Sequence, residues 1–347
     1  MMEDPAVSEI MINGPDRVYV ERAGQIERTE VRFETEQDLL AAAQNIAQFI
    51  GQEFSDENPV LDGRLPDGSR VCIVRSPVAT DGTSMNIRRF SPVAHGPEFL
   101  LDRNAITPVA LEFLLLAVAT HRNILVSGGT GSGKTTLLNV LSSGFSDRER
   151  IVVIEDTQEL QIPKEHVVRL EARPADSRGR GRVTVRDLFV ASLRMRPDRI
   201  IIGEVRRGEA LDMVQAMTSG HRGSMATLHA STPSDACHRL ETMALMADVG
   251  LPLFALRRQV ASALDLIVQT NRLPDGRRLI TEISEVDYDE PKQAYALRDI
   301  FSLPVHLAES QLAWTGVRPR MADDPLLRLS VHWPPKNAFL YESAEGR

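Results

Sequence analysis

The chain has 347 residues, 42% of them hydrophobic, and a formal net charge of −8. This length and composition predict two domains with ordinary hydrophobic cores, exclude a globally disordered chain, and argue against bulk electrostatic attraction to nucleic acid, while leaving room for a local basic groove. The only two cysteines, Cys72 and Cys237, are far apart in the sequence. We therefore expect neither a disulfide framework nor a cysteine-based zinc site, and a reducing cytosol fits best.

The N-terminal segment, 1–95, is predicted to form a small α+β domain. It opens with no basic region followed by an apolar run, and the longest apolar stretch of the chain, 110–120, is too short to span a bilayer, so a soluble protein is expected. Apolar residues recur at helical spacing over 39–50, and Gly51 is well placed to stop that helix. The predicted strands are 17–20, 26–33, 70–75 and 84–90.

A linker is expected between the two domains. The stretch 91–96 contains Pro and Gly but little periodicity, and the domain boundary is drawn over 96–106. After it, Thr107 and Pro108 form a good N-cap and first-turn pair for a helix that runs to about His121.

The second domain, predicted over 107–302, alternates short apolar runs with helical patterns. This alternation is typical of βαβ units, so the fold class is α/β with a mainly parallel sheet. The strand candidates are 124–127, 151–155, 200–203 and 225–229. The helix candidates are 134–141, 184–195, 208–219, 233–246 and 252–264. A terminal hairpin is expected within 264–286, and prolines break the pattern of the C-terminal tail, 303–347.

A phosphate-binding motif lies between the first strand and the next helix of this domain. The run fits G-x-x-x-x-G-K-[ST] and comprises Gly128, Gly129, Thr130, Gly131, Ser132, Gly133, Lys134 and Thr135. Its glycines let backbone N–H groups converge on a β-phosphate, and the helix N-terminus, which continues with Thr136, adds positive potential. Lys134 can reach the β and γ oxygens, and Thr135 can hold Mg²⁺. The motif therefore predicts a site for the phosphates of a nucleotide.

Two apolar strands of this domain end in acidic residues, as a hydrolytic site requires. A site that hydrolyses ATP must hold Mg²⁺ and orient a water, and carboxylates at the C-terminal ends of neighbouring strands do both. The run 200–204 ends in Glu204 and has the general form of a Walker B strand, and 152–156 has the same form with Glu155. Either acid alone is about as often a solvated strand end, but two of them beside a complete P-loop indicate an ATPase site.

Histidine and arginine can complete such a site. His229 ends a predicted strand of the same sheet, which places its imidazole on the nucleotide edge, where it can sense a γ-phosphate. Arginines supply positive charge to the transition state, and a neighbouring subunit of a ring can deliver one. The candidates are Arg64, Arg70, Arg75, Arg88 and Arg89 in the first domain and Arg194, Arg196, Arg206 and Arg207 in the second.

Four elements, in this order, resemble the secretion ATPase superfamily of type II secretion, type IV pilus and type IV secretion motors. They are the P-loop, the acidic box 154–160, the Walker B strand through Glu204 and the histidine box 220–229. Three further stretches are similar to the CpaF-like ATPase of tight-adherence (Flp) pilus assembly: 64–71, 193–199 and 239–243. The chain lacks the four-cysteine zinc insertion of type II secretion and type IV pilus extension motors, which disfavours that branch.

The resemblance implies a RecA-like P-loop domain, a smaller N-terminal domain that closes over the nucleotide, and a cytoplasmic homohexamer that acts on inner-membrane platform proteins. It implies ATP and Mg²⁺ as ligands. By the same resemblance Glu155 polarises the attacking water, Glu204 assists at the metal and the water, and His229 reports on the γ-phosphate. Among the arginines, it favours Arg64 and Arg70, with Arg194 and Arg206 as further candidates.

Three alternatives to a pilus or secretion motor stay open. A conjugative type IV secretion ATPase is a close one. A nucleic-acid-stimulated RecA-like motor is another, because a basic run comprises Arg173, Arg178, Arg180, Arg182 and Arg186. No aromatic residues interleave there for base stacking, so a charged loop at a subunit boundary is the simpler explanation, and no stable nucleic-acid binding is expected. The third is a protein that binds ATP without hydrolysing it, against which Lys134, Glu155 and Glu204 argue.

Overall fold

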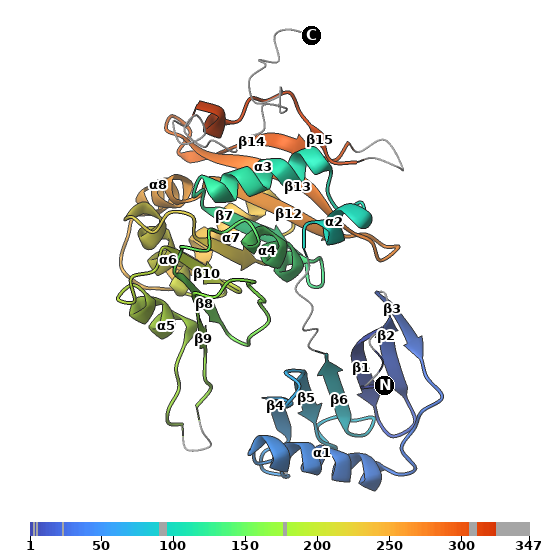
Figure 1. Cartoon of the computed structure of the whole chain (residues 1–347). Coiled ribbons are helices and arrows are strands. Elements are labelled where there is room, and N and C mark those ends of the chain that lie inside the picture. Colours follow the sequence, from blue (N-terminus) through green and yellow to red (C-terminus); the bar gives the residue numbers. More distant parts are fainter. Residues whose placement is uncertain are drawn as a thin grey trace. The chain divides into compact units, whose positions relative to one another are not determined.

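The computed structural model of this chain divides into two compact units, Met1–Val93 and Ala94–Arg347 (Figure 1). The structure describes residues 1–2, 4, 6–22, 24–89, 96–175, 179–304 and 311–323. Each unit has its own sheet and its own hydrophobic core.

The first unit is a six-stranded antiparallel sheet with one long helix, and its strand order is β3-β2-β1-β6-β5-β4. The elements are β1 (Val7–Asn13), β2 (Val18–Arg22), β3 (Gln25–Arg28), α1 (Glu36–Ile50), β4 (Val60–Arg64), β5 (Arg70–Val74) and β6 (Ser84–Arg88). Strands β1 and β4 are missing from the sequence-based prediction. In β4 the central Asp62 and Gly63 have low strand propensity, and pairing with β5 outweighs it.

Helix α1 covers one face of this sheet. Thr35 caps its start, since the Thr35 side chain accepts from the Asp38 N–H while the Asp38 carboxylate accepts from the Thr35 N–H, and Gly51 ends it at φ 70°. Leu39 and Ala43 are fully buried against the strands. The apolar spacing read from the sequence is therefore the face that packs.

Three arginines lie in a row across the other face of the same sheet. The register sets Arg64 of β4 directly opposite Arg70 of β5, and Arg70 directly opposite Arg88 of β6. Directly opposite residues share a face, and the neighbours Val71 and Ile87 are buried on the α1 side. We call these three residues the arginine row.

The second unit contains a nine-stranded sheet in the order β15-β14-β13-β12-β7-β11-β10-β8-β9. The strands are β7 (Ile124–Gly128), β8 (Ile151–Glu155), β9 (Val167–Glu171), β10 (Arg199–Ile202), β11 (Met225–Leu228), β12 (Leu266–Arg272), β13 (Arg278–Asp289), β14 (Ala294–Ser302) and β15 (Ala313–Trp314). Neighbours from β12 to β9 pair in parallel, and those from β12 to β15 pair antiparallel. The predicted mainly parallel sheet and terminal hairpin are both present.

Helices cover both faces of this sheet (Figure 1). They are α2 (Glu98–Asp102), α3 (Pro108–Ala119), α4 (Lys134–Ser142), α5 (Val185–Ser192), α6 (Glu209–Thr218), α7 (Pro233–Leu245) and α8 (Leu253–Ala263), with a short 3₁₀ turn, η1 (Arg320–Asp323). Helices α3 and α4 pack into one core, and α5, α6, α7 and α8 pack into the other. None of the described helices is both long and apolar enough to cross a bilayer.

Two expectations at the ends of this unit differ from the structure. Helix α2 lies within the predicted 96–106 linker, because Leu100 and Ile106 are buried in the core of the second unit; the stretch 91–95 lies outside the described residues. The tail from 303 contributes β15 and η1, and Leu312 is buried, although 305–310 and 324–347 lie outside the described part.

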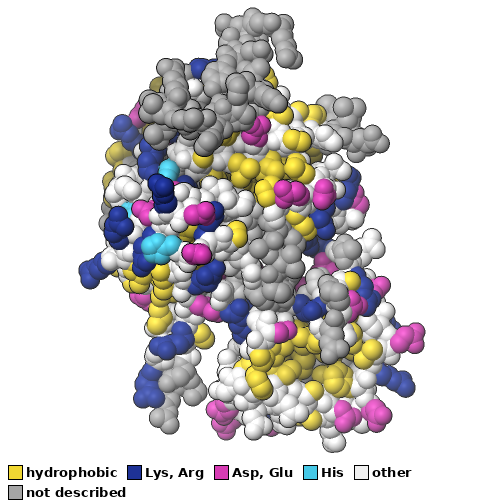
Figure 2. All heavy atoms as spheres, viewed as in Figure 1, with side chains coloured by type: hydrophobic (Ala, Val, Ile, Leu, Met, Phe, Trp, Pro, Cys, Tyr) yellow, Lys and Arg dark blue, Asp and Glu magenta, His cyan; other side chains and the backbone are white. Residues whose placement is uncertain are grey.

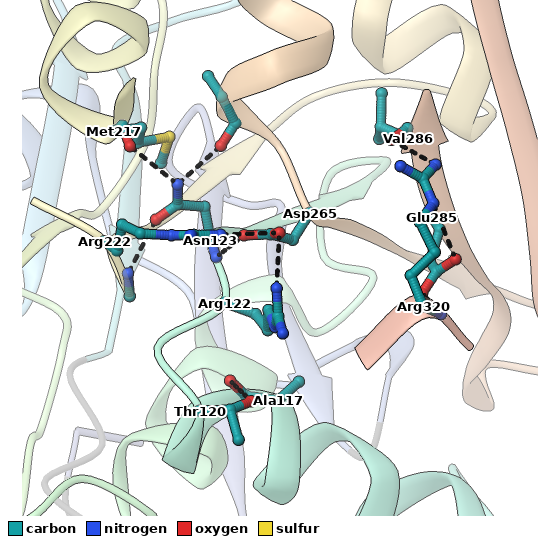
Figure 3. A network of polar contacts seen from close by, with 12 residues as sticks. Ala117, Thr120, Arg122, Asn123, Met217, Arg222, Asp265, Glu285, Val286 and Arg320 are labelled. Carbon is teal, nitrogen blue, oxygen red and sulfur yellow. Dashed lines mark hydrogen bonds and ion pairs between the residues drawn. The ribbon is translucent and has the colours of Figure 1, made fainter. Parts of the chain in front are cut away.

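A polar network holds the amino ends of β7 and β12 (Figure 3). The Asn123 N–H donates to Asp265 Oδ2 at 2.8 Å, and Asn123 Nδ2 donates to the carbonyls of Ala263 at 2.7 Å and Met217 at 3.3 Å. Arg122 and Arg222 both pair with the Asp265 carboxylate, each at 3.4 Å. These contacts fix the position of the start of β7. They therefore also fix the position of its carboxyl end, from which the glycine-rich loop begins.

Candidate active site

The carboxyl ends of β7, β8, β10 and β11 meet at one edge of the sheet, and the glycine-rich loop lies there. The loop leaves β7 at Gly128 and enters α4 at Lys134. Gly131 has φ 67° and Gly133 has φ 102°, in the left-handed region that favours glycine. Thr135 and Thr136 occupy the first turn of α4. This strand–turn–helix is the structural context that the phosphate-binding motif requires.

Strand β12 supports the loop from one side. A methyl group added to Gly128 would lie 2.3 Å from the carbonyl oxygen of Thr270, so only glycine fits at that contact. The Ser132 and Thr270 hydroxyls are 2.8 Å apart, and Gln269 bonds the Ser127 hydroxyl from the same strand. Sequence reasoning missed this support. Its signal was Gln269 and Thr270, two polar residues that directly follow the apolar run 266–268, and both are buried.

Lys134, His229 and Glu204 form a continuous polar chain on the other side of the loop. The ammonium of Lys134 donates to the carbonyls of Gly128 at 3.0 Å and Gly129 at 2.8 Å, and it lies 3.4 Å from His229 Nδ1. His229 Nε2 lies 3.0 Å from Glu204 Oε1. A neutral ring protonated at Nε2 satisfies both contacts, donating to Glu204 and accepting from Lys134.

The electrostatics of this chain agree with that protonation. Burial and the charge of Lys134 hold the pKa of His229 below its ordinary value, despite the neighbouring Glu204. Burial alone would raise the pKa of Glu204, but the hydrogen bond and charge of Arg206, together with His229 and Lys134, hold it below its ordinary value. At neutral pH the site thus contains a neutral imidazole between an ammonium and a carboxylate.

Arg206 and Asp156 extend the chain toward solvent. Arg206 Nη2 donates to Glu204 Oε2 at 2.7 Å, and its Nη1 donates to Asp156 Oδ2 at 2.8 Å. The guanidinium therefore orients Glu204 and is engaged by two carboxylates of this chain. Asp156 was not among the predicted site residues, although it directly follows Glu155 in the sequence.

Glu155 ends β8 in a different environment. Its side chain is 4% exposed, and its Oε1 accepts from the backbone N–H groups of Glu159 at 2.9 Å and Leu160 at 3.0 Å. Burial raises the pKa of Glu155 to about 7, against the lowering effect of those two hydrogen bonds. A methyl group on Gly203 would lie 2.8 Å from Glu155 Cγ, so glycine is required beside it. The result is a carboxyl poised to exchange a proton near neutral pH.

The predicted arginines do not all reach this edge of the sheet. Arg194 lies between the end of α5 and the start of β10, where the parallel strands begin, so within its own chain it is at the opposite edge from the P-loop, and its role stays a prediction. Arg64 and Arg70 belong to the first unit, and their role stays a prediction. Among the described residues, no three His, Cys, Asp or Glu side chains cluster as a metal site.

A cavity of about 440 Å³ lies away from this site, beside the network that holds the starts of β7 and β12. Its lining includes Arg122, Asp265, Glu285 and Arg320, and Figure 3 shows them as two pairs, Arg122 with Asp265 and Arg320 with Glu285. Arg320 donates to the carbonyl of Val286 at 3.1 Å and joins η1 to β13. The lining contains no residue of the glycine-rich loop, so we assign this cavity to the structural network.

A parallel sheet with a glycine-rich loop at its carboxyl edge, a lysine at the start of the next helix and two strand-end glutamates define a P-loop nucleotide-binding protein. The chain also matches the family described as type II/IV secretion system protein over residues 1–285, and it belongs to that family.

Relatives agree with this assignment. The putative conjugal transfer protein Rv3659c of Mycobacterium tuberculosis is 36% identical over 82% of this chain and 82% of its own length. The type IV secretion system protein VirB11 of Bartonella quintana is 33% identical over 86% of this chain and 92% of its own. The solved structure of the ATPase DotB of Legionella pneumophila has a TM-score of 0.59 at 20% identity, covering 84% of this chain and 80% of that one. The α/β fold class, with a RecA-like P-loop domain and a smaller α+β N-terminal domain, is confirmed.

Proposed function

We propose that this chain hydrolyses ATP and uses the reaction to drive a pilus or secretion machine. The observation that carries the proposal is the arrangement of two different glutamates around one P-loop. Glu204 is held ionised in contact with Arg206, whereas Glu155 is buried with a pKa near 7. One carboxylate suits a metal and the other suits a base that takes a proton from water at neutral pH.

Mg²⁺ is the metal that these groups fit. Thr135 in the first turn of α4 and Glu204 at the end of β10 offer hard oxygen donors, and Mg²⁺ in nucleotide sites binds few protein ligands beside phosphates and water. When bound, the ion supplies charge neutralisation at the phosphates. The residues of this chain then bind and orient the reactants. Lys134 binds the β and γ oxygens, and Glu155 accepts the proton of the attacking water. His229 contacts both Lys134 and Glu204 and holds them in position.

The arginine row offers the remaining positive charge. Like charges directly opposite on neighbouring strands repel each other. An anion bound between them is attracted by both guanidinium groups and offsets this repulsion. We propose that Arg64 and Arg70 contact the nucleotide phosphates in the assembled ring, as the family resemblance favours. Arg70→Ala is then expected to lower kcat while the second unit keeps its thermal stability.

The assembly that we propose is a cytoplasmic homohexamer bound to inner-membrane platform proteins. Tight-adherence pilus assembly is the first candidate system, from the stretches that resemble the CpaF-like group. A conjugative type IV system is the second, favoured by relatives whose names refer to conjugal transfer and type IV secretion. Neighbouring genes for two small polytopic membrane proteins and a pilin would favour the first, and conjugation genes the second.

Stable nucleic-acid binding is not part of this proposal. Basic side chains gather on the arm between β9 and α5 (Figure 2). Arg173 there donates to the carbonyl of Gly181 at 2.7 Å, and Arg186 pairs with Asp212 at 2.7 Å, which supports a structural use of the arm; Arg178 lies outside the described residues. DNA-stimulated hydrolysis that declines steeply with salt would favour the nucleic-acid motor instead.

The test is steady-state ATP hydrolysis by the full chain with Mg²⁺. Lys134→Ala is expected to abolish turnover, because the ammonium is the only strong cation built into the loop itself. Lys292→Ala is the matched control, since Lys292 is an exposed lysine paired with Asp289 on the far hairpin. Retained hydrolysis by Lys134→Ala, or an inactive wild-type hexamer, would refute the proposal.

A further inference from the structure

Two arginines of the β12–β13 hairpin lie directly against the glycine-rich loop. Arg272 ends β12 and Arg278 begins β13, and the register sets them opposite one another. A methyl group on Gly131 would lie 3.5 Å from Arg272 Nη1, and one on Gly133 would lie 3.8 Å from Arg278 Cδ. Both side chains are exposed, so a ligand seated on the loop can reach them.

The sheet order decides which end of a nucleotide these arginines meet. Strand β7, which carries the loop, has β12 and β13 on one side and β11, β10 and β8 on the other. Lys134 follows β7 itself, and the other side chains of this unit that we place at the γ-phosphate lie at the ends of strands of the second set: His229 after β11, Glu204 after β10 and Glu155 at the end of β8. Arg272 and Arg278 lie in the first set, at the end of β12 and the start of β13. A nucleotide that points its γ-phosphate toward the glutamates points its α-phosphate and base toward the hairpin.

We infer that Arg272 and Arg278 bind the nucleoside monophosphate end of the nucleotide, with their guanidinium groups against the α-phosphate. This inference rests on the proposed function and adds a second set of binding residues to the same site. The pairing of β12 with β13 holds the two guanidinium groups close together, so one phosphate can accept hydrogen bonds from both. Glycine at 131 and 133 keeps the loop thin enough for both side chains to lie over it.

Because ADP and ATP share the α-phosphate, both should lose the same fraction of their affinity. We expect Arg272→Ala and Arg278→Ala each to weaken the binding of ADP and of a non-hydrolysable ATP analogue roughly tenfold, as for the loss of one charge-assisted hydrogen bond at an exposed site. In hydrolysis the loss should fall on KM rather than on kcat, since the contact is the same in the ground state and the transition state.

The control is Arg277→Ala, because Arg277 lies in the same turn and pairs with Asp275 at 2.7 Å. Binding by titration calorimetry and melting without nucleotide are measured for wild type and all three variants; melting separates misfolding from lost contact. An ATP analogue weakened far more than ADP, a loss confined to kcat, unchanged affinities, or an equal loss in Arg277→Ala would each overturn the inference. Failure of the wild type to bind or hydrolyse would instead refute the proposed function.

Discussion

Glu155→Gln should stabilise the second unit at alkaline pH and abolish ATP hydrolysis. Burial holds the pKa of this carboxyl near 7, compared with an ordinary value of 4.5. Between these two values the folded state keeps a proton that the unfolded state has released, so stability falls as the pH rises through this window. Above pH 7 the free energy of unfolding has fallen by the full amount, roughly 3 kcal/mol. Glutamine does not ionise, so the Glu155→Gln variant does not suffer this loss.

The comparison of two pH values isolates this effect. The cost is under about 1 kcal/mol at pH 5 and roughly 3 kcal/mol at pH 8, so the benefit of Glu155→Gln should grow by more than about 2 kcal/mol between them. Any penalty from burying the amide is present at both pH values and cancels. The oxygen of the glutamine can still accept from the Glu159 and Leu160 N–H groups, which preserves the loop.

Urea unfolding without nucleotide, followed by tryptophan fluorescence, is the assay. Trp314 packs on the core of the second unit and donates to the carbonyl of Val317 at 2.8 Å, so its fluorescence reports on that unit. Glu165→Gln at an exposed site of the same unit sets the baseline for the substitution itself. An equal stability change at pH 5 and pH 8 would refute the buried, proton-holding carboxyl, and retained turnover would refute its role toward water.

Substitutions at three other positions give measurable outcomes. Gly203→Ala places a methyl group 2.8 Å from Cγ of Glu155, so kcat should fall roughly tenfold or more with an unchanged circular dichroism spectrum, and unchanged kcat would contradict this. Arg206→Ala removes the hydrogen bond that keeps the pKa of Glu204 low, so the acidic limb of the pH–rate profile should move to higher pH. An acidic limb at the same pH as in the wild type would contradict this role of Arg206. Arg199→Met breaks a buried ion pair of a 1% exposed guanidinium and should cost roughly 3–5 kcal/mol in urea unfolding, whereas a loss under about 1 kcal/mol contradicts that contact.

The sequence was sufficient where function depends on local order along the chain. The glycine-rich motif sets its own strand–turn–helix, and strands that end in Glu155, Glu204 and His229 must bring these residues to the same edge once the sheet is parallel. This is why the fold class and the proximity of Lys134, His229 and Glu204 could be predicted without coordinates.

The sequence was insufficient where function depends on which strands become neighbours. Thr270 supports the loop only because β12 pairs with β7, and the motif is more than a hundred residues upstream of it. Arg206 engages Asp156 across two strands, which no spacing rule indicates. Arg194 lies at the amino edge of the sheet because the chain goes from α5 to the start of β10, and whether it reaches a nucleotide of another chain depends on an assembly that the sequence does not specify. The pKa of Glu155 depends on burial, which composition alone does not give.

Strand β7 carries the loop and pairs with β12 on one side and with β11 on the other, and β12 is the strand at which the sheet changes from parallel to antiparallel pairing. The loop is tied to Thr270 on one side and, through Lys134, to His229 on the other. A force that shears the β12–β14 ribbon against the rest of the sheet acts on the β7–β12 pairing, beside the packing of α7 and α8 on the ribbon, and is expected to strain the loop. By linkage, a ligand that tightens the loop is expected to resist that shear, so a force on the ribbon and the affinity for that ligand are coupled at β7.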